Sequence, residues 1–363
     1  MARPTKASID LAAFRHNYRV AKAQSPNSQA VAIIKADAYG HGAIKLAHAL
    51  QEADAFGVAC IEEAIELRET GIKQPILLLE GFFEASELEL IQKYNFWTAV
   101  HSQAQIEAIE RQPQSSQFTI WLKLDSGMHR LGFSPQDYPA AFEQLNALPQ
   151  VDNIVHMTHF ACADELDKSM TQSQLQTCEA TFAQLKAQAS SFANSAATLA
   201  HPSSHSDQFS GYTRPGILLY GADPLSHSNS ASEQLIPVMT LTSKIIAIRE
   251  VKAHESVGYG ERYRCERDMK IGTVAIGYAD GYPRHAKDGT PVMVNGVRTQ
   301  LVGRVSMDML TVDLTDIPNA EIGSTVELWG KNVKAAEVAD YCDTIPYTLF
   351  TGITRRVHKE YID

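Results

Sequence analysis

The chain has 363 residues, more than one ordinary compact domain holds and enough for two, and its 44% hydrophobic content allows a sizeable core. Its formal net charge of −10 argues against general binding to nucleic acid or to anionic membranes, since either would need a basic surface. The five cysteines form no CxxC pair, no apolar stretch reaches the roughly 18 residues of a membrane span, and the first residues lack the apolar core of a signal peptide, so we expect a cytoplasmic protein without a metal site or membrane span.

Short apolar runs alternate with longer amphipathic stretches through about residue 220. Near-continuous apolar runs separated by helical patterns are typical of buried parallel strands with crossover helices. Many such units in succession favour a (β/α)8 barrel over an open doubly wound sheet. We expect strands at 30–34, 55–60, 75–79, 96–100, 118–124 and 153–157, and helices at 44–53, 62–70, 84–93, 102–111 and 168–187.

The pattern changes after about residue 235. Residues 238–251 alternate and are rich in Thr, Ile and Val, which indicates a long strand. The overall prediction is an α/β plus β protein: residues 1–230 form an N-terminal (β/α)8 TIM-type barrel, and residues 231–363 form a C-terminal mostly-β domain, with a Ser-rich loop at 225–232 near the boundary. Further strands are expected at 270–276, 291–294, 297–302, 310–312 and 325–329, with a short helix at 335–342.

Chemically capable side chains lie where the predicted barrel strands end. In a barrel, the carboxyl ends of all strands face one mouth, where active sites are built, so separate polar residues at these ends converge in space. The residues concerned are Lys35, Lys123, Arg130, His159, Asn194 and Ser195.

A series of motifs resembles those of alanine racemases. Residues 32–42, which contain Lys35, resemble the family's cofactor-lysine signature. The series runs in family order over nearly the whole chain, and this order makes it highly specific. The other matching segments are 3–11, 123–132, 158–161, 193–196, 214–221, 257–260, 277–282 and 303–308.

The resemblance implies a pyridoxal 5′-phosphate site. Lys35 would hold the cofactor as a Schiff base, which needs a rigid and partly desolvated position such as a strand end. Tyr39, Ser195 and the backbone amides of Gly216 and Ile217 would bind the phosphate. Amides of a tight turn and a small hydroxyl residue at a helix start suit an anion, although an N-cap is the commoner use of an Asn-Ser pair, and both roles can hold together.

The resemblance also implies an unusual partner for the nitrogen of the cofactor ring. Arg214 would face the pyridine nitrogen, where many other pyridoxal enzymes place a carboxylate. A cation about 4 Å away at an effective dielectric of about 20 interacts by about 4 kcal/mol, which disfavours protonation of the ring. The ring is then a weaker electron sink, which suits reprotonation of the same carbon. His159 and Asn194 complete the expected cofactor-binding residues.

Racemisation needs proton exchange on both faces of a planar carbanion, and two opposed bases achieve it without motion. By resemblance, Lys35 exchanges the D-alanine proton and Tyr259 the L-alanine proton. His159 would hydrogen-bond Tyr259 and be linked to Arg214. Without the flanking motif, a core tyrosine of the β domain would be the preferred interpretation of Tyr259.

The family pattern supplies substrate contacts as well. Arg130 and the backbone of Met307 would bind the substrate carboxylate, and Tyr278 and Tyr282 would line the entrance. In many relatives the lysine matching Lys123 is carbamylated. The resemblance favours this modification here, since an unmodified ammonium would repel Arg130.

The sequence departs from the family pattern near the C-terminus and at one other position. A tyrosine that contacts the phosphate often precedes an Arg-Val-Pro-Arg run near the C-terminus. Here Arg355 occupies the tyrosine position and the proline is absent. Arg355 can still bind phosphate as a cation. Ser306 stands where a cysteine is frequent, with little expected consequence.

Family members are head-to-tail dimers, so the resemblance implies a homodimer in which the partner supplies Tyr259, Tyr278 and Met307. The expected reaction interconverts L- and D-alanine, supplying D-alanine for peptidoglycan or degrading it. One alternative is a racemase of broader specificity that acts on serine or other amino acids. Another is a non-catalytic pyridoxal-phosphate-binding protein, which would lack the β domain. A decarboxylase fits less well, because Arg214 stands where such enzymes usually place a carboxylate.

Overall fold

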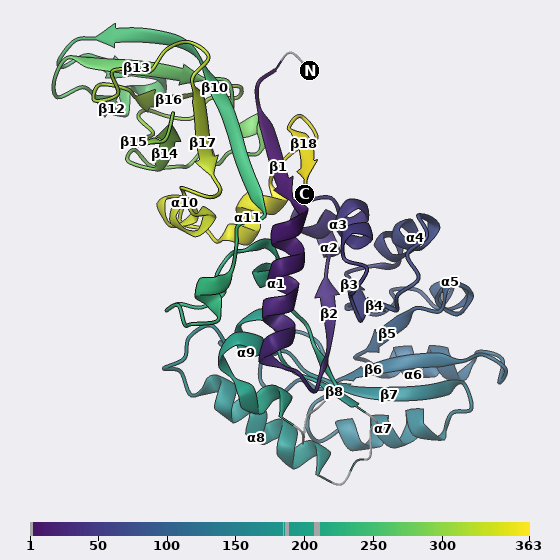
Figure 1. The fold of residues 1–363 in the computed structure, drawn as a ribbon. Coiled ribbons are helices and arrows are strands. Elements are labelled where there is room, and N and C mark those ends of the chain that lie inside the picture. Colours follow the sequence, from purple (N-terminus) through teal and green to yellow (C-terminus); the bar gives the residue numbers. More distant parts are fainter. Residues whose placement is uncertain (1–2, 184, 186–188, 207–210) are drawn as a thin grey trace.

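The computed structural model describes residues 3–183, 185, 189–206 and 211–363. A barrel and a C-terminal strand-rich part lie on opposite sides of the molecule, with β1 (Lys6–Asp10) and β18 (His358–Ile362) between them (Figure 1). Within the described residues, no helix combines the length and apolar character needed to cross a membrane.

Parallel strands form a nearly closed barrel, as predicted. Its strands follow the order β8-β7-β6-β5-β4-β3-β2-β9, and a bridge between Ser190 and Gly211 joins the two edge strands. The central strands are buried on both faces, which explains their near-continuous apolar sequences. The strands are β2 (Gln29–Ile33), β3 (Ala55–Val58), β4 (Ile76–Leu78), β5 (Trp97–Val100), β6 (Phe118–Lys123), β7 (Val151–Met157), β8 (Ala189–Ser191) and β9 (Tyr212–Thr213).

Amphipathic helices connect the barrel strands. In α1 (Leu11–Gln24), Asp10 caps the first turn by accepting from the Ala13 N–H (2.9 Å), and Phe14, Tyr18 and Ala21 face the core. The expected helix 168–187 corresponds to α8 (Met170–Phe182), and residues 184, 186 and 187 of that range lie outside the described residues. The other helices are α2 (Lys35–Tyr39), α3 (Ala43–Ala49), α4 (Ile61–Glu69), α5 (Glu87–Tyr94), α6 (Gln103–Glu110), α7 (Tyr138–Ala147), α8 (Met170–Phe182) and α9 (Ser195–Ala200).

The C-terminal sheet includes a strand from the N-terminus. β1 pairs antiparallel with β10 (Met239–Val251) and parallel with β18, so both ends of the chain join this sheet. Its order is β15-β14-β17-β10-β1-β18, and β13 pairs with β10 and β16. The remaining strands are β13 (Met269–Val274), β14 (Pro291–Val294), β15 (Val297–Gln300), β16 (Leu310–Asp313) and β17 (Thr325–Trp329), with a separate hairpin of β11 (Ser256–Val257) and β12 (Tyr263–Arg264).

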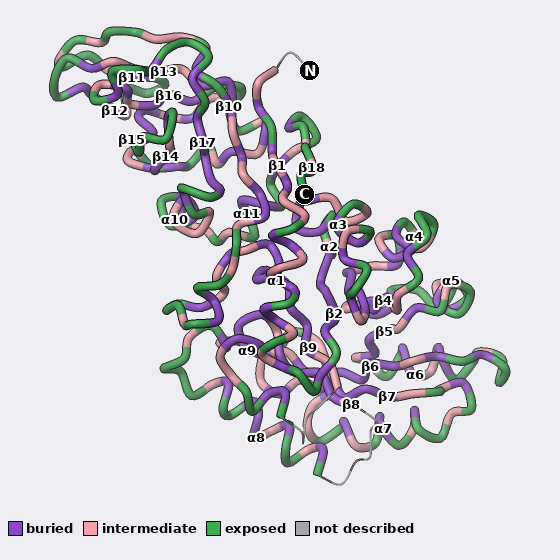
Figure 2. The backbone as a smooth tube through the Cα atoms, in the orientation of Figure 1, coloured by how far each residue is buried: buried purple, intermediate pink, exposed green. Residues whose placement is uncertain are grey.

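Two C-terminal helices link the sheet to the barrel. α10 (Ala335–Tyr341) is followed by α11 (Pro346–Thr351), which packs against α2. The approach is close: a Cβ added at Gly40 would lie 2.2 Å from the carbonyl oxygen of Phe350. Figure 2 shows buried backbone through the barrel strands and more exposed backbone at the outer end of the C-terminal sheet. The C-terminal segment thus supports the mouth of the barrel beside Lys35.

Candidate active site

Lys35 begins an unusual turn at the end of strand β2. The next four residues, Ala36 to Tyr39, all have left-handed backbone angles, with φ values of 53°, 52°, 53° and 49°. This conformation costs an L-residue roughly 1–2 kcal/mol, and runs of it are rare. Lys35 stands at one end of the turn and Tyr39 at the other, so the turn fixes the spacing of two predicted cofactor residues.

Carboxylates hold the first half of this turn. The Glu63 side chain accepts from the Ala36 N–H (2.7 Å) and from the Ala59 N–H (2.8 Å), so it ties the ends of β2 and β3 together. Asp37 accepts from the Ala43 N–H (2.8 Å) and pairs with Lys359 (2.6 Å). These contacts offset the conformational cost of the turn.

Tyr39, Ser195 and Gly216 meet in one small space. The Gly216 N–H donates to the Ser195 hydroxyl (2.7 Å), and a Cβ at Gly216 would lie only 2.9 Å from the Tyr39 hydroxyl. Burial raises the pKa of Tyr39 above its usual range, so its hydroxyl remains a proton donor. Ile217 begins the adjacent buried turn. Asn194 caps α9 by accepting from the Ala197 N–H (3.0 Å). A hydroxyl pair beside a glycine fits an oxyanion such as phosphate.

Arg214 is buried directly after β9. One guanidinium nitrogen donates to the carbonyl and the hydroxyl of Ser191 (both 2.6 Å), and the other donates to the Thr158 carbonyl (2.6 Å). The second nitrogen also lies 3.4 Å from Nδ1 of His159. Burial lowers the pKa of Arg214 to about 10, which keeps it cationic at neutral pH. Because these partners are uncharged, the cation is not neutralised by them.

The barrel mouth is strongly cationic. Burial, followed by the charges of Arg214, Arg130 and Lys35, lowers the pKa of Lys123 at the end of β6 to about 8. Burial and the same group of cations hold the pKa of His159 well below its usual value, so its imidazole is neutral. Arg130 is exposed at the rim. Such a site attracts an anionic ligand.

Tyr259, Tyr278 and Met307 lie on the C-terminal part. Their exposed fractions are 69%, 37% and 53%. Tyr259 sits in the β11–β12 hairpin at the outer end of the sheet, far from α2 of the same chain (Figure 1). The Ala279 N–H donates to the Met307 carbonyl (3.0 Å), which joins the Tyr278 and Met307 loops. Within one chain, therefore, Lys35 and Tyr259 do not meet.

A cluster of ion pairs around one buried carboxylate, that of Asp280, anchors these loops. Asp280 is fully buried and receives two hydrogen bonds from Arg3 (2.7 and 2.6 Å). Arg356 lies 3.3 Å from the same carboxylate and pairs with Asp308 (2.6 Å). Sequence reasoning missed this cluster, although Arg3, Asp280 and Asp308 all fall within recognised motifs.

Three further aromatic or basic residues lie on the C-terminal part. Arg355 is exposed, and its role toward phosphate stays a prediction. Tyr347 of α11, which the sequence did not suggest, lies beside Tyr39 with ring centroids 5.7 Å apart, and burial raises its pKa to about 12. Tyr282, which we expected at the entrance, is buried and stacks on Trp329 instead. Its large apolar ring fills the core of the C-terminal part.

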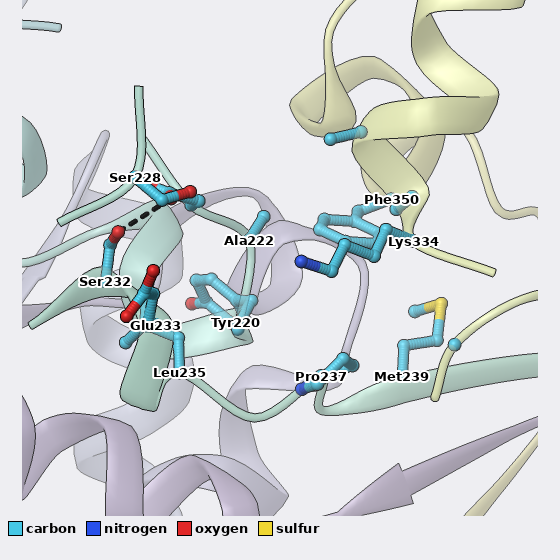
Figure 3. Close-up of a pocket in the computed structure, with 15 residues that line it drawn as sticks. Tyr220, Ala222, Ser228, Ser232, Glu233, Leu235, Pro237, Met239, Lys334 and Phe350 are labelled. Carbon is cyan, nitrogen blue, oxygen red and sulfur yellow. Dashed lines mark hydrogen bonds between the residues drawn. The ribbon is translucent and has the colours of Figure 1, made fainter. Parts of the chain in front are cut away.

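A cavity of about 170 Å³ lies where the barrel meets the C-terminal part (Figure 3). Tyr220, Met239, Lys334 and Phe350 line it, and none of the predicted site residues does. Tyr220 also packs against Tyr39, with the two rings tilted and their centroids 4.7 Å apart. The cavity is therefore behind the Lys35 turn and separate from the cationic mouth.

Comparison with known proteins agrees with this arrangement. Residues 9–224 match the family model "Alanine racemase, N-terminal domain", and residues 238–361 match "Alanine racemase, C-terminal domain". The chain belongs to the alanine racemase family. An alanine racemase of Pseudomonas fluorescens is 56% identical over 362 residues, 99% of each chain. A catabolic alanine racemase of Pseudomonas aeruginosa is 55% identical over 360 residues, again 99% of each.

The fold also matches solved alanine racemases. The crystal structure of the biosynthetic alanine racemase from Pseudomonas aeruginosa superposes with a TM-score of 0.95 at 46% identity, over 99% of this chain and 100% of that one. The structure of alanine racemase from Acinetobacter baumannii gives a TM-score of 0.93 at 36% identity, with 99% and 100% covered. Alanine racemases thus share both the barrel and the C-terminal part of this chain.

Proposed function

We propose that this chain interconverts L-alanine and D-alanine with pyridoxal 5′-phosphate as its cofactor. The observation that carries the proposal is the placement of Lys35 and Tyr39 at the two ends of one turn, beside Ser195 and Gly216. An amine next to a cradle of hydroxyl and amide donors is what an aldehyde cofactor with a phosphate group requires. When bound, the cofactor supplies an electron sink for the carbon that loses its proton.

Each cofactor residue has a task that follows from its surroundings. Lys35 offers the amine that holds the cofactor, and Tyr39, Ser195 and the amides of Gly216 and Ile217 offer donors to its phosphate. Asn194 supports Ser195 by capping the helix that Ser195 begins. Arg355 adds a cation near the C-terminus. Arg214, held as a cation, disfavours a proton on the ring nitrogen and so limits side reactions.

His159 connects Arg214, the residue proposed to face the cofactor ring, to the second base. The Arg214 guanidinium can only donate, so Nδ1 of His159 accepts. The hydrogen of the neutral imidazole is therefore on Nε2. That N–H is free to donate to a phenolate oxygen. A phenolate at Tyr259 stabilised in this way can remove a proton from L-alanine, while the Lys35 amine serves the D-alanine face.

The second base has to come from another copy of the chain. Tyr259 is 69% exposed, and the β11–β12 hairpin that carries it lies far from α2 of its own chain (Figure 1). We therefore propose a homodimer with shared active sites, in which Tyr259, Tyr278 and Met307 of the partner subunit cover the barrel mouth. Arg130 and the Met307 amide then bind the substrate carboxylate, and Tyr278 narrows the entrance.

Lys123 completes the substrate site. With a pKa of about 8, a substantial share of its amine is neutral near physiological pH and can react with carbon dioxide. The resulting carbamate would be an anion beside Arg130, and would orient that guanidinium rather than repel it. We propose that the reaction takes place in the cytoplasm and serves either D-alanine supply or D-alanine breakdown.

The test is a racemisation assay with purified protein and added pyridoxal phosphate. Chiral chromatography should show L-alanine and D-alanine approaching equal amounts from either side. Lys35→Ala should remove both reactions. Comparable turnover of L-serine or L-lysine would favour the broader-specificity alternative, and cofactor binding without any turnover would favour the non-catalytic one.

A further inference from the structure

His41 follows the left-handed turn and is completely buried. Its Nδ1 atom lies 2.9 Å from the carbonyl oxygen of Tyr39 and 3.1 Å from that of Ala38. Carbonyl oxygens accept only, so Nδ1 must carry the hydrogen. The neutral ring therefore has one defined tautomer, and both of its hydrogen bonds end on the turn that joins Lys35 to Tyr39.

The other ring nitrogen has no comparable role. Nε2 is buried and has no hydrogen-bond partner among the residues that the structure describes. The ring packs against Tyr220 and Phe350, with centroid distances of 4.6 and 5.1 Å. Burial lowers the pKa of His41 to about 4, so the ring stays neutral. A buried acceptor without a partner is costly, and a residue that carries one needs a compensating use.

A core residue kept for packing alone would not explain this arrangement. Phenylalanine would fill the same aromatic environment without a partnerless nitrogen. The feature that phenylalanine lacks is the Nδ1–H donor. The His41 backbone is itself held in place, because the Tyr361 hydroxyl of β18 donates to its carbonyl (3.1 Å). Strand β18 thus helps to fix the position of the Nδ1–H donor of His41.

We propose that His41 is a positioning residue whose Nδ1–H holds the left-handed turn, and so sets the spacing between the Lys35 amine and the Tyr39 hydroxyl. Glu63 holds the Lys35 end of the turn through the Ala36 N–H, and His41 holds the Tyr39 end. Loss of the His41 donor releases the Tyr39 end first. The phosphate contact then suffers more than the bond to Lys35. This inference rests on the proposed function, because it assumes that pyridoxal phosphate binds between these residues.

The experiment titrates cofactor-free protein with pyridoxal phosphate and with pyridoxal, following the visible absorbance of the lysine-bound form. His41→Phe keeps the aromatic packing and removes the donor. His41→Asn keeps a donor near the Nδ1 position and loses the ring. We expect His41→Phe to weaken pyridoxal phosphate binding about ten-fold or more, with a smaller loss for pyridoxal, and His41→Asn to stay within about three-fold of the parent. Tyr39→Phe is the reference for loss of the phosphate contact.

The outcomes distinguish failure of the proposed function from failure of the proposed role of His41. If the parent protein does not bind pyridoxal phosphate, the proposed function fails. If it binds and His41→Phe binds equally well, or if Phe and Asn weaken binding equally, only the role of His41 is overturned. Thermal unfolding of the cofactor-free forms checks folding. Should His41→Phe not fold, His41→Gln moves the donor to the Nε2 position: weaker binding than His41→Asn supports the proposal, and equal binding overturns it.

Discussion

Removal of dissolved carbon dioxide should weaken substrate binding through Lys123. Lys123 is buried at the end of β6, and burial together with three neighbouring cations lowers its pKa to about 8. At pH 7 about one amine in eleven is then neutral, against roughly one in 3,000 for a lysine at its ordinary pKa. The neutral amine, which is the form that reacts with carbon dioxide, is therefore enriched about 300-fold, and we expect the carbamate to form at ambient carbon dioxide.

The carbamate should be visible and should control the KM for alanine. Protein equilibrated with ¹³C-bicarbonate at pH 8 should give one carbamate NMR signal that Lys123→Met lacks. Depletion of carbon dioxide turns an anion beside Arg130 into an ammonium, a change of about 1.4 kcal/mol or more in that neighbourhood. We therefore expect the alanine KM to rise about ten-fold, reversibly, with no such response in Lys123→Met.

The carbamate of Lys123 should also depend on pH. Carbamate formation should increase as pH rises from 7 to 8, because the neutral amine increases over that interval. A protein without the ¹³C signal at pH 8, and with the same KM before and after carbon dioxide removal, would refute this account of Lys123. A Lys123 amine that titrates near pH 10 would show that burial and the neighbouring cations do not act on it as argued.

Three further substitutions test how the site is held together. Glu63→Gln leaves one oxygen acceptor for two amide donors. It should lower the free energy of unfolding by about 1–3 kcal/mol in urea titrations and weaken cofactor binding. Unchanged stability would show that Glu63 does not stabilise the turn. Gly216→Ala places a methyl group 2.9 Å from the Tyr39 hydroxyl and should weaken pyridoxal phosphate binding about ten-fold or more by absorbance titration; parent-like affinity would exclude the proposed cradle. Asp280→Asn removes the charge paired with Arg3 and should raise the alanine KM more than it lowers kcat. If steady-state kinetics show both constants unchanged, the ion pairs around Asp280 do not position the Tyr278 and Met307 loops at the substrate entrance.

The sequence predicts the fold well where the pattern is local. β14 and β17 begin and end where predicted, because alternating residues between turn signals define them. β9 has two residues and β8 three, too few for a periodic pattern. The pairing of β1 with β10 joins residues more than 200 positions apart, and no local signal encodes such a contact. Long-range pairing therefore had to come from the structure.

In the active site, too, local motifs can be predicted from the sequence and long-range packing cannot. The motif series marks Lys35, Tyr39, Ser195 and Arg214 one by one, and the structure adds how they are held. No sequence pattern indicates the left-handed backbone of the turn. Alanine, aspartate and tyrosine ordinarily avoid positive φ, and only the surrounding contacts impose this conformation. The position of Tyr347 beside Tyr39 is likewise set by the packing of α11 on α2.

Mixed dimers test the central claim most directly. The claim is that each active site combines Lys35 of one chain with Tyr259 of the other. Lys35→Ala and Tyr259→Phe, carried on separate chains with different affinity tags, should each be inactive as homodimers. The purified heterodimer should regain about half the parent racemase activity, since one of its two sites then holds both native bases. A heterodimer as inactive as its parents would contradict the shared site.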